Sequence, residues 1–231
     1  GAAAEWAGLL HVLSGGRELG EALVAHEQVD LVSATGSVAM GQGIRRTLAG
    51  KRNNVLPPIL ELGGNKAVII SNAMSEAHLE FALTSILSSF LGTTGQRCTN
   101  TRRLIVHRAW LEKTVSHLER MIAAFIAGPM RDPENIYGYN RLIDEDAEQR
   151  FRRAKEQAAA EGGKILFGGE GEPALAVMPA QTAIMHIETF APLLFIAPYD
   201  GGIEAALALV NAPENAGLVN GIYTLSKAEA E

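Results

Sequence analysis

Hydrophobic residues recur along much of the chain at the spacing of one helical face. The clearest run predicts an amphipathic helix over residues 76–91, whose inward positions are Leu79, Leu83, Ile86, Leu87 and Phe90. The same reasoning predicts a second long amphipathic helix, over residues 109–127. Further helices are expected at 5–10 (the end of a helix), 17–26, 36–44, 144–163 and 202–212. Of these, 144–163 is rich in charge and is expected to lie on the surface.

Short apolar runs without helical spacing predict strands between these helices. The β-branched apolar run 29–35 and the run 65–70 are typical of buried strands, and further strands are predicted at 11–16, 102–107, 164–169, 193–199 and 220–226. Residues 51–59 are expected to form a polar loop, because Pro57 and Pro58 exclude a central strand. Alternating strands and helices predict an α/β fold with parallel, doubly wound, Rossmann-like sheets. A boundary is expected in the Pro-rich stretch "PPILELGG", which divides the chain into 1–62 and 63–231.

Composition narrows the classes of function. Hydrophobic residues make up 47% and charged residues 20% of the 231 residues, which is typical of a soluble α/β protein. The net charge of −6 argues against a nucleic-acid partner, since phosphate binding requires a basic face. A single cysteine cannot form an internal disulfide, so we expect a reducing, cytoplasmic location. No apolar run is long enough to cross a membrane, no signal peptide is recognisable, and no metal site is predicted.

The single cysteine, Cys98, lies in the sequence "GTTGQRCTN" between a predicted helix and a predicted strand. A free cysteine is often a small buried hydrophobe, and that interpretation stays open here. However, a Gly/Thr-rich loop is an unusual place for core packing, and three arginines follow or precede the thiol within five residues. Nearby cations stabilise a thiolate. The residues alone therefore leave a reactive thiol and a packing residue as alternatives.

A possible anion site follows the predicted strand at 29–35. Gly36 and Ser37 lead from this strand into a helix that carries Gly41 one turn further on. Main-chain N–H groups at a helix N-terminus can bind a pyrophosphate, and glycines permit a close approach. The G-x-x-x-x-G spacing differs from the usual dinucleotide fingerprint, so a plain serine-capped helix is the alternative.

Two carboxylates stand beside glycine or aromatic residues. Glu61 follows apolar residues and precedes two glycines in "ILELGGN", where a carboxylate could act as a general base. Glu188 and Phe190 lie in "IETFAP", where the carboxylate could bind ribose hydroxyls while the ring packs on a base. A surface glutamate before a turn and a charged strand edge are the respective alternatives.

The order of these four pieces resembles the NAD(P)-dependent aldehyde dehydrogenase superfamily. The motifs "TGSVAMG", "ELGGN", "GQRCT" and "ETFAP" follow one another, and the resemblance runs over essentially the whole chain. The forms "GTTGQRCTNTRRLIVHR" and "ETFAPLLF" look most like the branch that contains α-aminoadipic semialdehyde dehydrogenase. The chain resembles an internal portion of that family, with a partial coenzyme-binding domain at 1–62 followed by a catalytic domain at 63–231.

The resemblance implies a thiol mechanism of aldehyde oxidation. Cys98 would attack the aldehyde carbon, a hydride would pass to NAD (NADP is not excluded), and Glu61 would activate the water that hydrolyses the thioester. Arg97 would contact the carboxylate end of an amino-acid semialdehyde, with Thr99 also on the substrate side. The residues implied for coenzyme binding are Gly36, Ser37 and Gly41 at the pyrophosphate, Leu62 near the carboxamide, Glu188 at the ribose and Phe190 beside the ring.

The resemblance also carries expectations about the rest of the site. The family's oxyanion asparagine and adenosine-binding lysine are expected before residue 1, and "GGEGEPALAV" is expected to be a shortened hairpin. An isolated chain of this length is therefore expected to be nearly inactive, and a non-catalytic remnant of the enzyme is the alternative function. A cysteine hydrolase that pairs Cys98 with His107 is another alternative. Lysine catabolism and a homo-oligomer, a dimer or a tetramer, are expected for the full-length enzyme.

Overall fold

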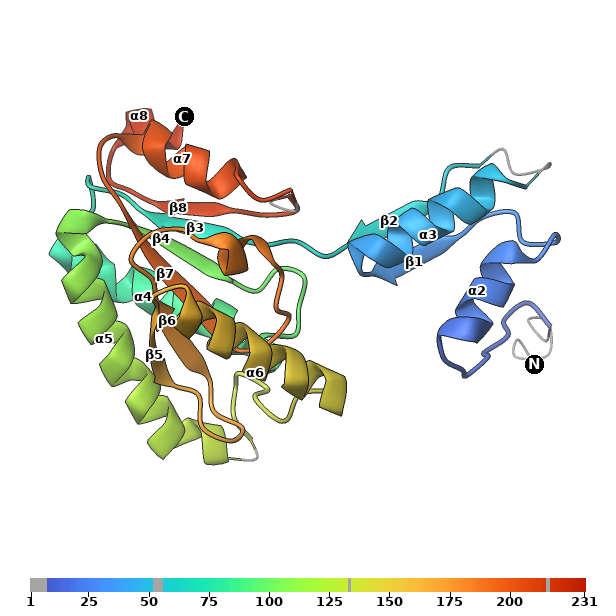
Figure 1. Cartoon of the computed structure of the whole chain (residues 1–231), viewed down its shortest axis with the longest axis horizontal. Coiled ribbons are helices and arrows are strands. Elements are labelled where there is room, and N and C mark those ends of the chain that lie inside the picture. Colours follow the sequence, from blue (N-terminus) through green and yellow to red (C-terminus); the bar gives the residue numbers. More distant parts are fainter. Residues whose placement is uncertain (1–7, 52–55, 133, 215–216) are drawn as a thin grey trace, which may run out of the picture. The chain divides into compact units, whose positions relative to one another are not determined.

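The chain divides into two compact units. The computed structural model describes residues 8–51, 56–132, 134–214 and 217–231. Unit 1 is Gly1–Leu62 and unit 2 is Gly63–Glu231 (Figure 1). The roles of the two units as coenzyme-binding and catalytic domains stay predictions.

Unit 1 is a small α/β unit. Its elements are α2 (Arg17–Ala25), β1 (Ser33–Gly36), α3 (Val38–Ala49) and β2 (Ile59–Leu62), and its two strands pair in parallel. Helix α3 lies close to β2, because a Cβ atom added at Gly41 would lie 2.7 Å from both methyl carbons of Leu62. The Lys51 ammonium group donates to the carbonyls of His26 (2.7 Å) and Val29 (3.0 Å), which ties the end of α2 to α3.

Several strand predictions for unit 1 were wrong in detail. Residues 11–16 form no strand; they are exposed and lead directly into α2. The strand expected at 29–35 begins only at Ser33, because its partner β2 is four residues long. Strand β2 itself was missed: Pro57 and Pro58 precede the strand and do not interrupt it. Of the helix end expected at 5–10, residues 8 and 9 form a turn, Leu10 has no regular structure, and the others lie outside the described residues.

Unit 2 is built on a six-stranded sheet in the order β5-β6-β7-β4-β3-β8. Strands β6, β7, β4, β3 and β8 run parallel, and β5 pairs antiparallel with β6 at the edge. Five parallel strands joined by helices confirm the predicted doubly wound α/β fold. The strands are β3 (Ala67–Ile70), β4 (Arg103–His107), β5 (Lys164–Phe167), β6 (Ala174–Val177), β7 (Leu193–Tyr199) and β8 (Gly221–Tyr223).

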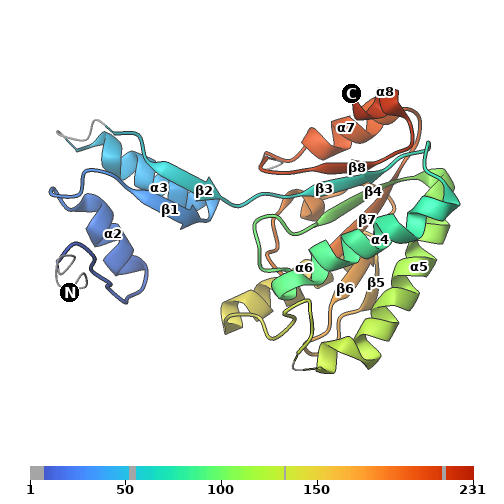
Figure 2. The ribbon, with the colours of Figure 1, turned by 180° about the vertical axis from the view of Figure 1, so that it is seen from behind.

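Helices cover both faces of this sheet, because alternate strand residues point to opposite sides. Helices α4 (Glu76–Leu91) and α5 (Arg108–Ala127) cover one face, as Figure 2 shows. Leu104 and Val106 of β4 pack against them. Ile105 packs on the other face with α6 (Glu145–Ala160) and α7 (Ile203–Asn211). The remaining helices are short: η1 (Gly92–Gly95), η2 (Pro129–Arg131), η3 (Ala183–His186) and α8 (Lys227–Ala230).

The longest apolar patterns of unit 2 were predicted to the residue. Helix α4 spans the expected 76–91 and strand β7 the expected 193–199, whereas the other predicted strands and helices are up to a few residues shorter or longer than expected. Strand β6 was missed because "ALAV" is a short, alanine-rich run. It forms a hairpin with β5 in the segment that was expected to contain a shortened one.

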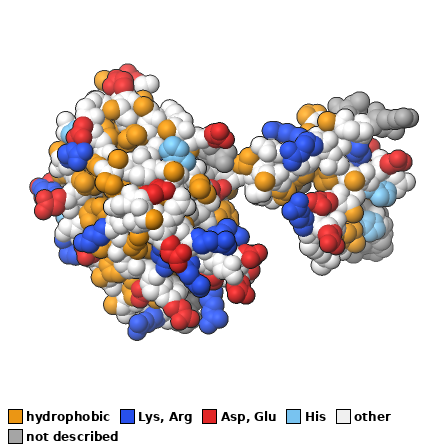
Figure 3. All heavy atoms as spheres, in the orientation of Figure 1, with side chains coloured by type: hydrophobic (Ala, Val, Ile, Leu, Met, Phe, Trp, Pro, Cys, Tyr) orange, Lys and Arg blue, Asp and Glu red, His pale blue; other side chains and the backbone are white. Residues whose placement is uncertain are grey.

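The surface gives further constraints. Acidic and basic side chains are interspersed on the face of unit 2 in Figure 3. Within the ranges that the structure describes, none of the helices is both long and apolar enough to pass through a bilayer.

Candidate active site

Three predicted motifs meet at the amino ends of neighbouring strands in unit 2. Cys98 precedes β4, Glu188 and Phe190 precede β7, and Gly63 and Gly64 precede β3. Because β7, β4 and β3 are adjacent and parallel, these segments lie at one edge of the sheet. The motifs are separated by up to about 125 residues in the chain, yet the fold brings them together.

The Cys98 segment (residues 95–100) is a tightly held turn. The Asn100 amide donates to the carbonyl of Gly92 at 3.0 Å and to that of Ser89, and its carbonyl oxygen accepts from the Arg97 main chain at 2.6 Å. Asn100 itself is fully buried, so a buried side chain holds the conformation of the turn. Cys98 is half-buried, with exposed residues on both sides of it. It is therefore a partly accessible thiol in a turn and does not fill the core.

Gly95 brings this segment against the residues that follow Glu188. Its φ of +69° favours glycine, and an added Cβ would overlap the carbonyl oxygen of Ala191 and lie 2.7 Å from the nitrogen of Pro192. The two residues before the turn, Thr93 and Thr94, also have positive φ angles of 54° and 55°. Such backbone strain persists only where surrounding contacts fix it.

A single buried guanidinium connects the two segments. Arg102 is 1% exposed and donates to the carbonyls of Gly95 and Arg97 (2.7 Å) in the Cys98 segment. The same side chain donates to the carbonyl of Ala191 at 3.3 Å. Its hydrogen bonds therefore connect the Cys98 segment with the segment 188–192.

Arg102 also faces the two predicted coenzyme residues of that segment. One of its nitrogens lies 3.8 Å from Glu188 Oε1, and its guanidinium carbon lies 5.3 Å from the centre of the Phe190 ring. Burial lowers the pKa of Arg102 to about 10, an effect opposed by Glu188 and, to a smaller extent, Cys98. Arg102 keeps its charge at neutral pH.

Glu188 occupies a cradle made by the glycines of "ELGGN". A Cβ added at Gly63 would overlap Glu188 Oε2 and lie 3.0 Å from the carboxyl carbon, so a larger residue there would displace the Glu188 carboxylate. Burial raises the pKa of Glu188, whereas the charge of Arg102 and a hydrogen bond from the Gly64 main chain oppose that rise. Oε1 is buried and accepts no hydrogen bond from any described residue.

Arg103 points away from this site although it is adjacent to Arg102. It is fully buried and donates to the carbonyls of Asn65 (2.9 Å), Leu209 (3.0 Å) and Val210 (2.9 Å). The last two carbonyls belong to the C-terminal turn of α7, which favours a cation. Burial lowers the pKa of Arg103 to about 10. Arg103 is therefore near Cys98 in the sequence, but its hydrogen-bond partners lie outside the Cys98 segment.

The candidate residues of unit 1 gather at the carboxyl ends of its two strands. Gly36 pairs with Leu62 and Thr35 with Glu61 across β1 and β2. Ser37 is the N-cap of α3, and its hydroxyl accepts a hydrogen bond from the Met40 main chain at 3.1 Å. The serine cap that was one of two alternatives is present, and it leaves the other alternative open. Glu61 is exposed on its unit.

Comparison with known proteins establishes the family. The model of the aldehyde dehydrogenase family matches residues 3–231. The chain belongs to the aldehyde dehydrogenase family. Among curated relatives, α-aminoadipic semialdehyde dehydrogenase of Bos taurus is 33% identical over 219 residues, which are 91% of this chain and 39% of that protein. Aldehyde dehydrogenase family 7 member A1 of Brassica napus is 31% identical over 223 residues, or 93% and 43%.

Solved structures of aldehyde dehydrogenases share the fold. The γ-glutamyl-γ-aminobutyraldehyde dehydrogenase of Burkholderia cenocepacia J2315 matches with a TM-score of 0.81 at 26% identity, over 95% of this chain and 45% of that one. Lactaldehyde dehydrogenase of Escherichia coli matches with a TM-score of 0.79 at 29% identity, over 95% and 46%. The chain thus spans about two fifths of the length of its curated relatives, of which 39% and 43% are covered in the two cases above.

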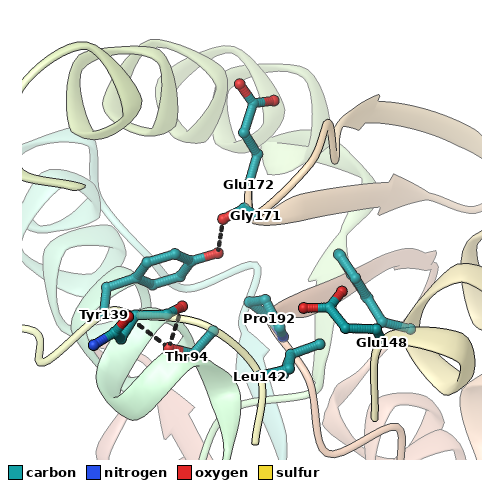
Figure 4. Close-up of a pocket in the computed structure, with 9 residues that line it drawn as sticks. Thr94, Tyr139, Leu142, Glu148, Gly171, Glu172 and Pro192 are labelled. Carbon is teal, nitrogen blue, oxygen red and sulfur yellow. Dashed lines mark hydrogen bonds between the residues drawn. The ribbon is translucent and has the colours of Figure 1, made fainter. Parts of the chain in front are cut away.

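A second layer of contacts supports the Cys98 segment of this aldehyde dehydrogenase chain. Thr94 exchanges two hydrogen bonds with the Asn140 main chain, at 2.8 and 3.0 Å, and Gln96 accepts from the Ile143 main chain at 2.9 Å. A small pocket lies behind this contact, where Tyr139 donates to the carbonyl of Gly171 at 3.0 Å (Figure 4). Cys98 does not line this pocket. The pocket is therefore part of the packing that supports the Cys98 segment and is not the candidate active site.

His107 is placed where it cannot assist Cys98. It is the last residue of β4, whereas Cys98 precedes the first, so about 13 Å of extended strand lies between them. Its ring accepts from the Ala109 main chain at 3.2 Å as the N-cap of α5. The cysteine hydrolase that pairs these two residues is therefore not supported.

Sequence reasoning missed the structural roles of three residues. Arg102 connects the two segments, Asn100 fixes the Cys98 segment through its hydrogen bonds, and Gly63 leaves space for the Glu188 carboxylate. One signal was available for the first of them. Arg102 and Arg103 are consecutive at the start of a strand, so their side chains must point to opposite faces.

Proposed function

We propose that the chain carries the thiol half of an NAD(P)-dependent aldehyde dehydrogenase site, with Cys98 as the nucleophile. The observation that supports this most is the convergence of the Cys98 segment with Glu188 and Phe190 at one sheet edge, joined by Arg102. Family membership supports the same reaction class. A half-buried thiol in a turn is accessible to a substrate, which a core cysteine is not.

The chemistry assigned to the chain's own residues has two stages. The Cys98 thiolate adds to the aldehyde carbon, and loss of a hydride from that carbon leaves a thioester on Cys98. Glu61 then takes a proton from a water molecule that attacks the thioester, which releases the carboxylate and the thiol. A bound nicotinamide coenzyme supplies the acceptor for the hydride.

The residues of the segment 188–192 fit a nicotinamide ribose. Glu188 Oε1 has no hydrogen-bond donor among the described residues, and a ribose hydroxyl is such a donor. Phe190 is 37% exposed beside it, which leaves ring surface for a coenzyme. In unit 1, Gly36, Ser37 and Gly41 would lie along the pyrophosphate, and the Leu62 main chain near the carboxamide. Both NAD and NADP satisfy these contacts.

The proposed substrate is an amino-acid semialdehyde. Arg97 is exposed next to Cys98, and its Nε donates to Thr93 Oγ1 at 2.6 Å. Its two terminal nitrogens make no hydrogen bond with a described residue, so they are available to a substrate carboxylate, with Thr99 exposed beyond Cys98. The name of the bovine relative, α-aminoadipic semialdehyde dehydrogenase, supports this substrate class and a place in lysine catabolism. A homo-oligomer, dimer or tetramer, is proposed for the full-length enzyme.

A trapping experiment tests this function without requiring full turnover. The chain is incubated with NAD and α-aminoadipic semialdehyde, and the mass of the Cys98 peptide is measured together with NADH formation. We expect an acyl adduct on Cys98 that accumulates in Glu61→Gln, because the thioester is no longer hydrolysed, and no adduct in Cys98→Ser. Coenzyme binding without any adduct would favour the non-catalytic remnant.

A further inference from the structure

We infer that Arg102 is the positioning residue of this site: it joins the Cys98 segment to the segment 188–192 and places a buried positive charge against the turn that carries Cys98. The consequence for catalysis rests on the proposed function, whereas the positioning itself does not. The geometry behind the inference is the set of carbonyls that one guanidinium reaches, two in the Cys98 segment and one at Ala191.

The shape of an arginine suits this task. A guanidinium presents N–H groups in a rigid plane, so it can bind carbonyls in two directions at once, whereas a lysine ammonium is a single point on a flexible stem. Here one terminal nitrogen serves Gly95 and Ala191, and the other serves Arg97. The guanidinium carbon lies over the Phe190 ring, 5.3 Å from its centre, and Phe190 itself has a positive φ of 50°. Arg102 therefore constrains both segments in conformations that neither would keep alone.

The charge of Arg102 is only partly compensated. Its contact with Glu188 is 3.8 Å long, which is an ion pair without a hydrogen bond, and its Nε is buried with no partner among the described residues. At 1% exposure the charge is weakly screened, so an anion formed at Cys98 would feel it more strongly than it would feel an exposed cation. The residue thus has a positional and an electrostatic role that different substitutions separate.

The adjacent residue provides a matched control. Arg103 is equally buried and equally rich in carbonyl partners, but these partners are Asn65 and the end of α7. Arg103→Gln removes a buried cation and destabilises the fold without touching the Cys98 segment. A second control, Arg108→Gln, removes an exposed cation that pairs with Asp200 at the opposite end of β4.

The electrostatic role is tested by alkylating the single thiol of the chain. Rates are measured for iodoacetamide, which is neutral, and iodoacetate, which is anionic, on the folded chain without coenzyme. We expect Arg102→Gln to lower the ratio of the iodoacetate rate to the iodoacetamide rate about 3- to 10-fold, because the local positive charge is lost. Arg102→Lys, Arg103→Gln and Arg108→Gln should keep the wild-type ratio.

The positional role is tested by amide hydrogen exchange of the same proteins. Both Arg102→Gln and Arg102→Lys should speed exchange in peptides covering 95–100 and 188–192 by about tenfold or more, whereas Arg103→Gln should speed it in α7. If Arg102→Gln does not fold, Arg102→Lys still tests this role. Exchange at the wild-type rate in Arg102→Lys would overturn the positional role. A wild-type alkylation ratio in folded Arg102→Gln would overturn the electrostatic role. Neither readout uses coenzyme or aldehyde, so failure of the trapping experiment leaves it unaffected.

Discussion

At the residue scale, two glycines of unit 2 share a left-handed backbone but differ in their surroundings. Gly95 has φ +69° and presses on Ala191, whereas Gly201 has φ +87° with no atom within 4 Å of an added Cβ. Gly201→Ala should lower the free energy of unfolding by about 1–2 kcal/mol, the cost of the backbone conformation. Gly95→Ala should cost clearly more, about 3 kcal/mol or above, because the methyl group meets main-chain atoms. Urea unfolding measures both, and equal losses would refute a tight contact at Gly95.

Glu188 gives a prediction about pH. Burial raises its pKa above the ordinary value, so between these two values the folded chain binds more protons than the unfolded chain. Stability contributed at this residue is therefore greatest at low pH and falls as pH rises through the raised pKa. The Glu188→Gln variant has no ionisable carboxyl group at this position, so its stability does not fall in this way as pH rises. The difference in unfolding free energy between wild type and Glu188→Gln should shift against the wild type as pH rises above about 4.5, and a difference that is constant from pH 4 to 8 would contradict the assignment.

Single residues also mark the limit of sequence reasoning. Cys98, Glu188 and Phe190 were selected from local chemistry and motif order, and the fold does bring their segments together. The contacts that hold them there involve carbonyls and glycines that are far apart in the chain, as in the pair of Gly95 and Ala191. A main-chain carbonyl has no signature in the sequence. The sequence therefore indicates that Arg102 and Arg103 point to opposite faces, but not which carbonyls Arg102 binds.

At the element scale, Ser37 has two roles at the start of helix α3: it caps the helix, and it is proposed to bind the coenzyme. Two substitutions distinguish these roles. Ser37→Ala should cost about 1 kcal/mol of stability because the cap to Met40 is lost. Ser37→Asp keeps a capping oxygen and suits a helix N-terminus, so it should be about as stable as the wild type. Its negative charge would repel a pyrophosphate, however, and should weaken coenzyme binding at least about tenfold.

The control for the two Ser37 variants is a serine at the start of another helix. Ser75 is the N-cap of α4 but makes no capping hydrogen bond, so Ser75→Ala should change stability less than Ser37→Ala. Thermal unfolding and calorimetric titration with NAD measure the two effects. Unchanged coenzyme affinity in Ser37→Asp would leave Ser37 as a cap alone.

Helices and strands with long hydrophobic patterns were predicted more accurately than those with short ones. Helix α4 has seven buried residues at helical spacing and β7 has seven consecutive buried residues, and both were predicted to the residue. Strands β2 and β6 have four residues each, too few for a periodic signal. Their existence depends on partners elsewhere in the chain, β1 for one and β5 and β7 for the other.

At the scale of the whole molecule, the two units present their candidate residues at different ends of their strands. Parallel α/β sheets usually bind ligands beyond the carboxyl ends of their strands, and Gly36 and Ser37 of unit 1 follow that rule. The Cys98 segment of unit 2 lies at the amino ends instead. Fold class was therefore predictable from the sequence, but the edge that carries the thiol was not, since it depends on strand order.

The two units should also differ in local stability. Among described residues, unit 1 buries only Gly41, Ile44 and Leu48, and α2 buries none of its side chains. Unit 2 has fully buried strands and helices on both sheet faces. Because opening unit 1 exposes little apolar surface, its amides should exchange through a local opening, with protection at least about 100-fold lower than in β4 and β7.

Hydrogen exchange across a urea series distinguishes this from a single cooperative unit. We expect exchange in α3 to change little with low urea, because its opening exposes little surface, and exchange in β4 to follow global unfolding. Lys51→Met, which removes the ammonium that holds the end of α2, should speed exchange in α2 and α3 and leave β4 unchanged. Exchange that rises equally in β4 would show that the two units unfold together, and the stability of the thiol site would then depend on unit 1 as well.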